Sequence, residues 1–289
     1  MLGSPEASVV IPILNGEATL ERQVEAVRAQ LPSDAELVLV DNGSTDATAD
    51  LITRLASSDP RIRGVYCPDR GVNRARNAGV MAARSNRILM CDADDEVHPG
   101  WVDAMRSALE AADLVGGIPE AVDLSGRPIP ELSPFRFELW GMTSPWGCCC
   151  AFRKELWEQI GGFDERMSGW FDELDFFLRG QLAGASLAWS EDAVVTYTWR
   201  ISDRDRLRKQ REQQYHSCRV YWRGRMQGRP RRGRVLRDLG HLVVRAPLAV
   251  VSVTRRRAWC LVALRRWARI RGFVRFGVPE IVGARVLRR

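Results

Sequence analysis

The chain has 289 residues, of which 45% are hydrophobic and 27% are charged, and these proportions exclude a disordered or collagen-like chain. Its seven cysteines form no CxxC pair and three of them are adjacent, so we expect free thiols in a reducing compartment rather than a disulfide framework. There is no run of about 18 apolar residues and no signal-peptide pattern, which predicts a cytoplasmic protein without a simple membrane-spanning helix.

The net charge of +7 is divided unevenly along the chain. Residues 201–289 carry 24 Arg and one Lys against five acidic residues, whereas residues 1–200 carry 18 basic and 31 acidic residues. This split predicts two parts with different roles, an acidic domain over 1–200 and a basic helical extension over 201–289.

Buried-type strands alternate with helical patterns over the first part of the chain. This order is typical of an α/β domain with a mostly parallel central sheet covered on both faces. The expected strands are 8–13, 36–40, 61–67, 88–91, 113–117, 146–152 and 194–197. The expected helices are 19–30, 46–55, 71–83, 99–111, 154–160 and one opening at Asp172 and Glu173, while residues 121–142 are expected to be irregular.

The apolar run 88–91 ends in three carboxylates, Asp92, Asp94 and Asp95. Asp92 and Asp94 flank one small residue, so in an extended segment both side chains point to the same side. Two hard oxygen ligands at a strand end suit a divalent cation that also holds phosphate oxygens. An equally weighted alternative is an acidic turn in which Asp94 or Asp95 caps the next helix.

Three other groups have both a structural and a functional interpretation. Asp41 follows a strand and is free to bind a ligand, although residues 42–46 read as turn and cap. Arg74, Arg76 and Asn77 open a helix that suits phosphate, or form a solvated basic turn. Asp172 and Glu173 are either a general base and its neighbour or ordinary helix-terminal acids. We expect Cys148–Cys150 to be core thiols.

The order of these motifs resembles family 2 glycosyltransferases of the GT-A type over about residues 7–200. The segments that carry the resemblance are Val9–Pro12, Val40–Asp46, Ala75–Gly79, Cys91–Asp95, Gly161–Asp164, and Asp172–Asp175 with Arg179. Each segment is weak alone, and their shared order is specific. The resemblance implies a single GT-A-type nucleotide-binding domain followed by the Arg-rich extension.

The resemblance also implies an inverting sugar transfer with roles for particular residues. The family's donor-nucleotide pocket falls on Pro12, Asn15, Asp41, Arg76 and Asp92, with a lean toward UDP. Its metal motif falls on Asp92 and Asp94, which implies Mn²⁺ or Mg²⁺ on the diphosphate. Its acidic pair falls on Asp172 and Glu173, one of which would deprotonate a hydroxyl of a glycan, glycolipid or small-molecule acceptor.

Two departures from the family pattern are visible. The acidic pair is usually Glu then Asp, and here it is Asp172 then Glu173, so the sequence does not say which is the base. Many members carry a metal-reaching His after the last strand, but here Tyr197–Trp199 occupy that region and the next His is His216. We therefore expect fewer protein ligands on the metal, with water completing the shell.

The extension has an apolar stripe at helical spacing, formed by Trp259, Ala263, Trp267, Ile270 and Val274. With the surrounding arginines, residues 241–276 suit a helix at an anionic membrane surface, at the inner face of the membrane. Packing on the domain or on a partner is the second interpretation, and nucleic-acid binding is unlikely because no recognition motif is present.

Two other functions remain as alternatives to a glycosyltransferase. A nucleotidyltransferase-like enzyme would share the metal and nucleotide pocket, but Asn15-Gly16 is too little for a Gly-rich phosphate loop. A non-catalytic nucleotide-binding protein would keep the fold without turnover. A Rossmann dehydrogenase is disfavoured because no GxGxxG follows the first strand.

Overall fold

The computed structural model describes residues 4–132, 136–139, 142–167 and 172–200, with eight further residues in the extension: Arg237, Leu239, Ala263, Arg266, Trp267, Ile270, Arg271 and Val274. The chain divides into two compact units. The first comprises Met1–Arg166 and Asp172–Arg200, and the second comprises Met167–Phe171 and Ile201–Arg289.

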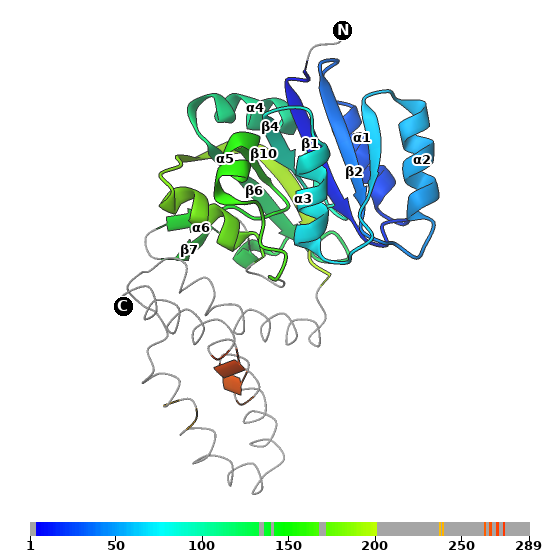
Figure 1. The fold of residues 1–289 in the computed structure, drawn as a ribbon. Coiled ribbons are helices and arrows are strands. Elements are labelled where there is room, and N and C mark those ends of the chain that lie inside the picture. The colour runs from blue at the N-terminus through cyan, green and yellow to red at the C-terminus, as the bar shows by residue number, and fades with distance from the viewer. Residues whose placement is uncertain are drawn as a thin grey trace, which may run out of the picture. The chain divides into compact units, whose positions relative to one another are not determined.

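The first unit is built on an eight-stranded sheet (Figure 1), in the order β3-β2-β1-β4-β9-β6-β10-β5. Its strands are β1 Ala7–Ile13, β2 Ala35–Asp41, β3 Ile62–Tyr66, β4 Arg87–Met90, β5 Glu96–Val97, β6 Leu114–Val122, β9 Cys150–Arg153 and β10 Leu187–Thr198. The neighbours β3/β2, β2/β1, β1/β4 and β6/β10 are parallel. β9 is antiparallel to both β4 and β6, and β5 to β10. The predicted mostly parallel sheet is confirmed.

Helices cover both faces of this sheet. They are α1 Leu20–Arg28, α2 Thr48–Ser58, α3 Val72–Ala82, α4 Trp101–Ala111, α5 Lys154–Ile160 and α6 Leu174–Leu182, with a 3₁₀ turn at Pro130–Leu132 and a small hairpin of β7 Phe137–Leu139 with β8 Met142–Ser144. Alternate residues of β1 enter different cores, because successive strand side chains point to opposite faces. Val9 and Ile11 pack with α1, α2 and α4, and Val10 packs with α3, α5 and α6.

The boundaries differ from the sequence prediction where long-range contacts decide them. The strand expected at 146–152 begins only at Cys150, because residues 146–149 form a turn closed by the Cys149 amide bonding to the Trp146 carbonyl. β6 runs on to Val122 because it pairs with β10 along its length. Neither Asp94 nor Asp95 caps α4: the cap position is Gly100, and β5 lies between.

Little of the extension belongs to the described residues. Ala263, Trp267 and Ile270 of the predicted apolar stripe are helical, whereas Trp259 and most of 241–276 lie outside the described residues, as does His216. Within the part of the chain that is described, no helix combines the length and apolarity needed to cross a bilayer.

Candidate active site

Five of the predicted site residues lie at or just after the carboxyl ends of three neighbouring strands: Pro12, Asn15, Asp41, Asp92 and Asp94. β2 and β1 run in register, so that Asp41 at the end of β2 lies beside Ile13 at the end of β1. β4 lies on the other side of β1 and ends at Met90, directly before the acidic segment. Because the three strands are parallel, the loops that follow them all lie at the carboxyl end of the sheet, where α/β proteins bind ligands.

The loops after β1 and β2 are hydrogen-bonded to each other. Asn15 adopts a left-handed conformation with φ 54°, and its Oδ1 accepts a 2.9 Å hydrogen bond from the Thr45 amide. Its own amide donates to the Ser44 hydroxyl, and the Ser44 amide donates to Oδ1 of Asp41. Pro12, Asn15 and Asp41, which the sequence assigned to one nucleotide pocket, therefore come from two strand ends that are joined by direct contacts.

The acidic loop after β4, residues 92–95, presents its three carboxyl groups at different depths. Asp92 is half-buried, and Gln23 holds the loop by donating to the Asp92 carbonyl at 2.9 Å. Asp94 exposes 49% of its side chain, whereas Asp95 is fully buried. Burial, followed by the charges of Asp92 and Asp94, raises the pKa of Asp95 well above its ordinary value. Asp94 is therefore the carboxylate of the loop with the most access to a ligand from solvent.

The same loop has the donor atoms that a cation requires. Asp92, Asp95 and Cys148 each place one possible ligand atom within 4.8 Å of the others. Oδ2 of Asp95 is buried and has no hydrogen-bond partner among the described residues, while Oδ1 accepts from the Thr198 amide at 3.2 Å. An uncompensated buried acceptor of this kind fits a nearby cation. Burial raises the pKa of the Cys148 thiol well above its ordinary value, so carboxylates are the better ligands for a hard ion.

Asp94 has a basic partner that the sequence did not indicate. Nη1 of Arg200 lies 2.7 Å from Oδ2 of Asp94, and Nη2 donates to the main-chain carbonyl of Asp94 at 2.9 Å. Arg200 follows β10, in the region where the family often has a histidine. The structure thus places a guanidinium directly on a predicted metal ligand.

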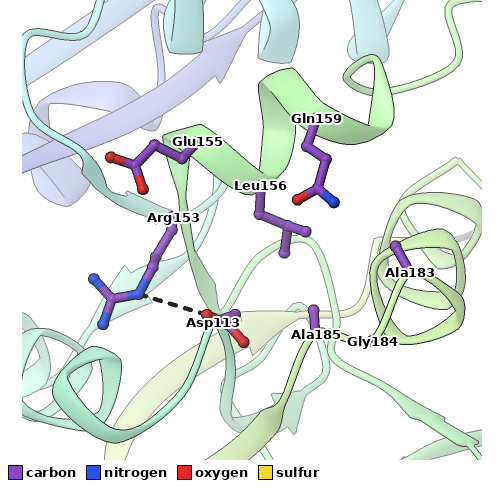
Figure 2. Close-up of a pocket in the computed structure, with 8 residues that line it drawn as sticks. All are labelled: Asp113, Arg153, Glu155, Leu156, Gln159, Ala183, Gly184 and Ala185. Atoms are coloured by element: carbon purple, nitrogen blue, oxygen red, sulfur yellow. Dashed lines mark ion pairs between the residues drawn. The ribbon is translucent and has the colours of Figure 1, made fainter.

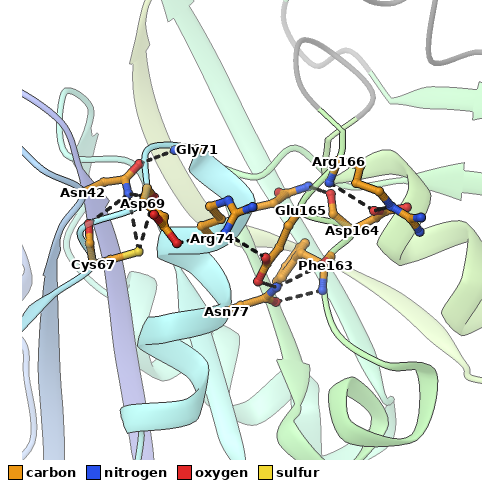
Figure 3. A network of polar contacts seen from close by, with 11 residues as sticks. Asn42, Cys67, Asp69, Gly71, Arg74, Asn77, Phe163, Asp164, Glu165 and Arg166 are labelled. Atoms are coloured by element: carbon orange, nitrogen blue, oxygen red, sulfur yellow. Dashed lines mark hydrogen bonds and ion pairs between the residues drawn. The ribbon is translucent and has the colours of Figure 1, made fainter.

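Two asparagines of α3 hold the segment that leads to the acidic pair. Asn77 makes two hydrogen bonds to the main chain of Phe163, accepting from its amide and donating to its carbonyl, both at 2.9 Å (Figure 3). Asn73, one turn earlier, donates to the carbonyls of Asp164 and Asp172. Main-chain groups of residues remote in sequence are therefore fixed to one helix face.

Arg76 lies on the same helix and pairs with both members of the acidic pair. Its Nη1 is 3.3 Å from Oδ2 of Asp172 and 3.8 Å from Oε2 of Glu173, and the residue is only 3% exposed. Burial alone would lower the pKa of Arg76, but the charges of Asp172, Glu173 and Asp92 raise it above its ordinary value. The cation thus joins the acidic pair electrostatically to the acidic loop.

Burial has a different effect on Glu173. It raises the pKa of Glu173 well above the ordinary value of 4.5, and neighbouring Asp172 raises it further. A carboxylate with a raised pKa is a stronger proton acceptor near neutral pH.

Two glycines allow the close approach on which this arrangement depends. A Cβ at Gly147 would lie 2.4 Å from Nη2 of Arg76, so any larger residue would require the guanidinium to shift. A Cβ at Gly79 would lie 2.4 Å from Cγ1 of Val10 and 2.8 Å from Cγ2 of Val40. The small residues of the Ala75–Gly79 motif therefore let α3 sit directly on β1 and β2.

A hollow of about 230 Å³ lies near the opposite ends of the central strands (Figure 2). Its lining includes Asp113 and Arg153, whose Oδ1 and Nε are 3.7 Å apart. Arg153 on β9 lies opposite Arg87 in the antiparallel ladder, at the amino end of β4. The acidic loop follows the carboxyl end of that strand. This hollow is separate from the candidate active site.

Comparison with known families identifies the domain. Residues 8–161 match the model of glycosyl transferase family 2, which is more than half of the chain. The chain belongs to glycosyl transferase family 2. The match covers the acidic loop and the α3 motif, and it ends before the acidic pair.

Named relatives of this family 2 chain come from several bacteria. The succinoglycan biosynthesis protein ExoO of Rhizobium meliloti (strain 1021) is 39% identical over 135 residues, which are 45% of this chain and 37% of that protein. The uncharacterized glycosyltransferase alr2836 of Nostoc sp. (strain PCC 7120) is 30% identical over 172 residues, 54% of this chain and 53% of that protein. The chain thus spans about half or less of the length of these relatives.

Solved structures of GT-A glycosyltransferases share the fold. The mannosyltransferase PcManGT from Pyrobaculum calidifontis, solved with GDP-Man and Mn²⁺, superposes with a TM-score of 0.60 at 17% identity, covering 94% of this chain and 88% of that one. GalNAc-T7, solved with UDP, GalNAc and Mn²⁺, gives 0.58 at 18% identity, covering 80% and 53%. The predicted GT-A-type fold is confirmed.

Asp41 and Asp92 lie at or directly after strand ends, as the sequence predicted, but several of the residues that surround the candidate site were not predicted. Asp41, Asp92, Arg76 and the acidic pair were candidates from the start. The missed residues are Asp95 as the buried member of the loop, Gly147, Cys148, Asn73 and Arg200. The position of Asn73 at the start of the Arg-rich helix could have marked it as a site residue. No sequence pattern around Arg200 indicated its contact with Asp94.

Proposed function

We propose that this chain is an inverting glycosyltransferase that moves a sugar from a nucleoside diphosphate sugar to an acceptor hydroxyl. The observation that carries the proposal is the convergence on Arg76: its guanidinium contacts Asp172 and Glu173, and its charge interacts with Asp92 of the acidic loop. The proposed base, which acts on the acceptor, and the proposed loop for the donor diphosphate therefore both interact electrostatically with Arg76. Family membership and the GT-A fold support the same reaction class.

The donor side of the reaction is assigned to the first strand ends. Asp41, Pro12 and Asn15 would receive the nucleoside, with Asp41 as acceptor for an imide N–H, which favours UDP. The donors in the two solved relatives differ, GDP-Man in one and UDP with GalNAc in the other, so the base is open to test.

Asp92 and Asp94 would hold a divalent cation, Mn²⁺ or Mg²⁺, as the proposed ligands. When bound, the ion neutralises charge on the departing diphosphate. The two solved relatives contain Mn²⁺, which supports a metal of this kind. Asp95 and Cys148 form a competing ligand set with Asp92, and their burial argues against direct contact with a diphosphate that arrives from solvent.

Glu173 is the proposed general base. Asp172 is the nearer of the two carboxylates to Arg76, which keeps it occupied as a counter-ion, whereas Glu173 is farther away and 21% exposed. Glu173 would take the proton from the acceptor hydroxyl as that oxygen attacks the anomeric carbon. Because no enzyme nucleophile takes part, one displacement inverts the anomeric centre.

The proposal is tested first by binding. Thermal unfolding is measured with UDP, GDP, ADP and CDP, each with and without Mn²⁺. Stabilisation by one diphosphate only when the metal is present identifies the donor class by linkage. Turnover of the matching nucleotide sugar by wild type, Asp92→Ala and Asp94→Ala follows. Unchanged turnover in both variants would refute the mechanism and favour a non-catalytic binding protein instead.

For the extension, we propose peripheral contact of residues 241–276 with an anionic membrane surface. The support is the sequence alone: arginines beside an apolar stripe. Co-sedimentation with vesicles of phosphatidylglycerol and phosphatidylcholine tests it, with pure phosphatidylcholine as control. Replacing Arg265, Arg266 and Arg269 by Gln should release the protein, and equal binding to both vesicle types would refute the electrostatic contact.

A further inference from the structure

We infer that Arg200 is an exchangeable counter-ion, which holds Asp94 in the absence of donor and transfers to the donor diphosphate when a cation takes Asp94. This inference rests on the proposed function. It adds to that function a residue that neither the family motif nor the sequence analysis assigned, and it explains how a predicted metal ligand can be occupied by a guanidinium.

Arg200 is positioned beside the acidic loop by the end of β10. The end of β10 is bonded to the acidic loop and to neighbouring segments: the Thr198 amide donates to Asp95 of the loop, and Oγ1 of Thr196 is hydrogen-bonded at 2.8 Å to Nε2 of His98, which follows β5. The Trp199 amide donates to the Val122 carbonyl at 2.7 Å. These bonds fix the main chain beside Arg200, so the guanidinium is held over the loop by a rigid strand end.

The guanidinium of Arg200 can donate more hydrogen bonds than the two that it makes to Asp94. Arg200 uses one N–H on Oδ2 of Asp94 and one on the Asp94 carbonyl. A guanidinium has five N–H groups in a planar fork that also matches phosphate oxygens. The side chain is 32% exposed, so it can exchange partners at modest cost, as expected for an ion pair in contact with solvent.

Arg76, a second cation near the site, is buried. Arg76 matches the family's diphosphate-contacting position, but it is 3% exposed and lies against Asp172 and Glu173. A guanidinium so placed contributes charge without offering a free edge to a ligand from solvent. Arg200 has the accessible edge and lies on the loop that is proposed to carry the diphosphate.

Charge balance gives the exchange its direction. A divalent cation at Asp94 competes with Arg200 for the same carboxylate oxygens, so the two cannot both bind Oδ2 fully. A diphosphate that arrives with the cation brings new acceptors for the displaced guanidinium. Arg200 should therefore oppose the binding of metal alone and favour the binding of metal together with diphosphate.

These opposite signs define the experiment. Mn²⁺ binding to the 289-residue chain is measured from the free-ion electron paramagnetic resonance signal. Pyrophosphate binding at saturating Mn²⁺ is measured by calorimetry, with orthophosphate as the comparison ligand. Pyrophosphate is used because it does not depend on the base of the donor. The variants are Arg200→Ala, Arg200→Lys and Arg22→Ala. Arg22 is a matched control because it pairs with Glu96 beside the same loop, with Nε 3.2 Å from Oε2.

We expect Arg200→Ala to bind Mn²⁺ alone about threefold to tenfold more tightly than wild type. We expect the same variant to bind pyrophosphate about 10- to 100-fold more weakly, with little change for orthophosphate. In both measurements, the affinity of Arg200→Lys should lie between those of wild type and Arg200→Ala. Lysine keeps the positive charge but lacks the planar set of N–H donors of the guanidinium. Arg22→Ala should match wild type.

Loss of both Mn²⁺ and pyrophosphate binding in Arg200→Ala would indicate a merely structural role and overturn the inference, as would affinities equal to those of Arg22→Ala. Wild type that binds neither Mn²⁺ nor pyrophosphate would overturn the metal-dependent function together with this inference. Normal binding by wild type with no effect at Arg200 would leave the proposed function intact and refute the exchange alone.

Discussion

Nη1 of Arg76 lies 3.3 Å from Oδ2 of Asp172, and both side chains are at least 90% buried. The pair is therefore a buried ion pair within the proposed base site, and its removal has consequences for both stability and catalysis. Breaking such a pair leaves one charge without compensation in a medium that solvates it poorly.

Arg76→Met should destabilise the protein by about 3–5 kcal/mol, because two buried carboxylates lose their counter-ion. Chemical denaturation of wild type, Arg76→Met, Asp172→Asn and the double variant measures the coupling. The double variant should recover part of the loss, since the stranded charge is then removed. Strictly additive free energies would show that the two side chains do not interact.

Glu173→Gln should lower kcat by roughly 10²- to 10⁴-fold with little change in donor affinity, because a carboxamide cannot accept the acceptor proton. Glu165→Gln is the control, as Glu165 lies near Asn77 and is 43% exposed. Equal loss in Asp172→Asn and no loss in Glu173→Gln would move the base role to Asp172.

The pH dependence follows from the raised pKa of Glu173. The base must be ionised to work, so activity falls when pH drops below its pKa. Because burial and Asp172 raise that pKa, the acidic limb of kcat/KM should lie well above the 4.5 of an ordinary glutamate. A pH–rate profile over 4 to 9 on wild type checks this, and a limb at or below 4.5 would contradict it.

Gly147→Ala should destabilise the protein by about 1–3 kcal/mol and reduce activity, because the new methyl group would meet Nη2 of Arg76 at 2.4 Å. Gly180→Ala is a suitable control: its methyl would lie 3.1 Å from Cδ1 of Leu114, the movable end of a side chain, within helix α6. The unfolding temperatures of Gly147→Ala and Gly180→Ala are compared with that of wild type. Equal stability would mean that the guanidinium moves aside at little cost.

Asp94→Asn should weaken Mn²⁺ binding by roughly 10- to 100-fold, whereas Asp95→Asn should change it by less than about threefold. The reason is access, since Asp94 is half-exposed and Asp95 is fully buried. Calorimetric titration with Mn²⁺ in the presence of the nucleoside diphosphate found by thermal screening tests both. The reverse order would place the ion among Asp92, Asp95 and Cys148.

Much of the fold follows from local patterns in the sequence. The β-branched runs that became β1 and β2 have alternate residues in opposite cores, and the Gly-Gly after Ile160 ends α5 where predicted. The acidic loop was predicted because carboxylates directly follow an apolar strand. These features depend on neighbours in sequence, which a pattern can represent.

The remaining contacts depend on residues brought together by the sheet order. Arg200 and Asp94 are 106 residues apart in sequence, and they meet because β10 returns beside β5. The burial of Asp95 depends on the same return, since the Thr198 amide reaches its carboxyl group. The sequence predicted Arg76 as a diphosphate-contacting residue or part of a solvated basic turn, and it did not predict the buried pair with Asp172, which lies almost 100 residues further along the chain. No local pattern carries this information.

Asn73 and Asn77 bond to main-chain groups of Phe163, Asp164 and Asp172, and one further bond runs from Asn77 to the side chain of Glu165. Every amino acid supplies the same carbonyl, so the bonds to Phe163, Asp164 and Asp172 do not depend on which side chains these three residues carry. The main-chain bonds that hold Asp172 to α3 are therefore independent of side-chain identity, so this part of the attachment of the acidic pair persists when the side chain of Asp164 is exchanged.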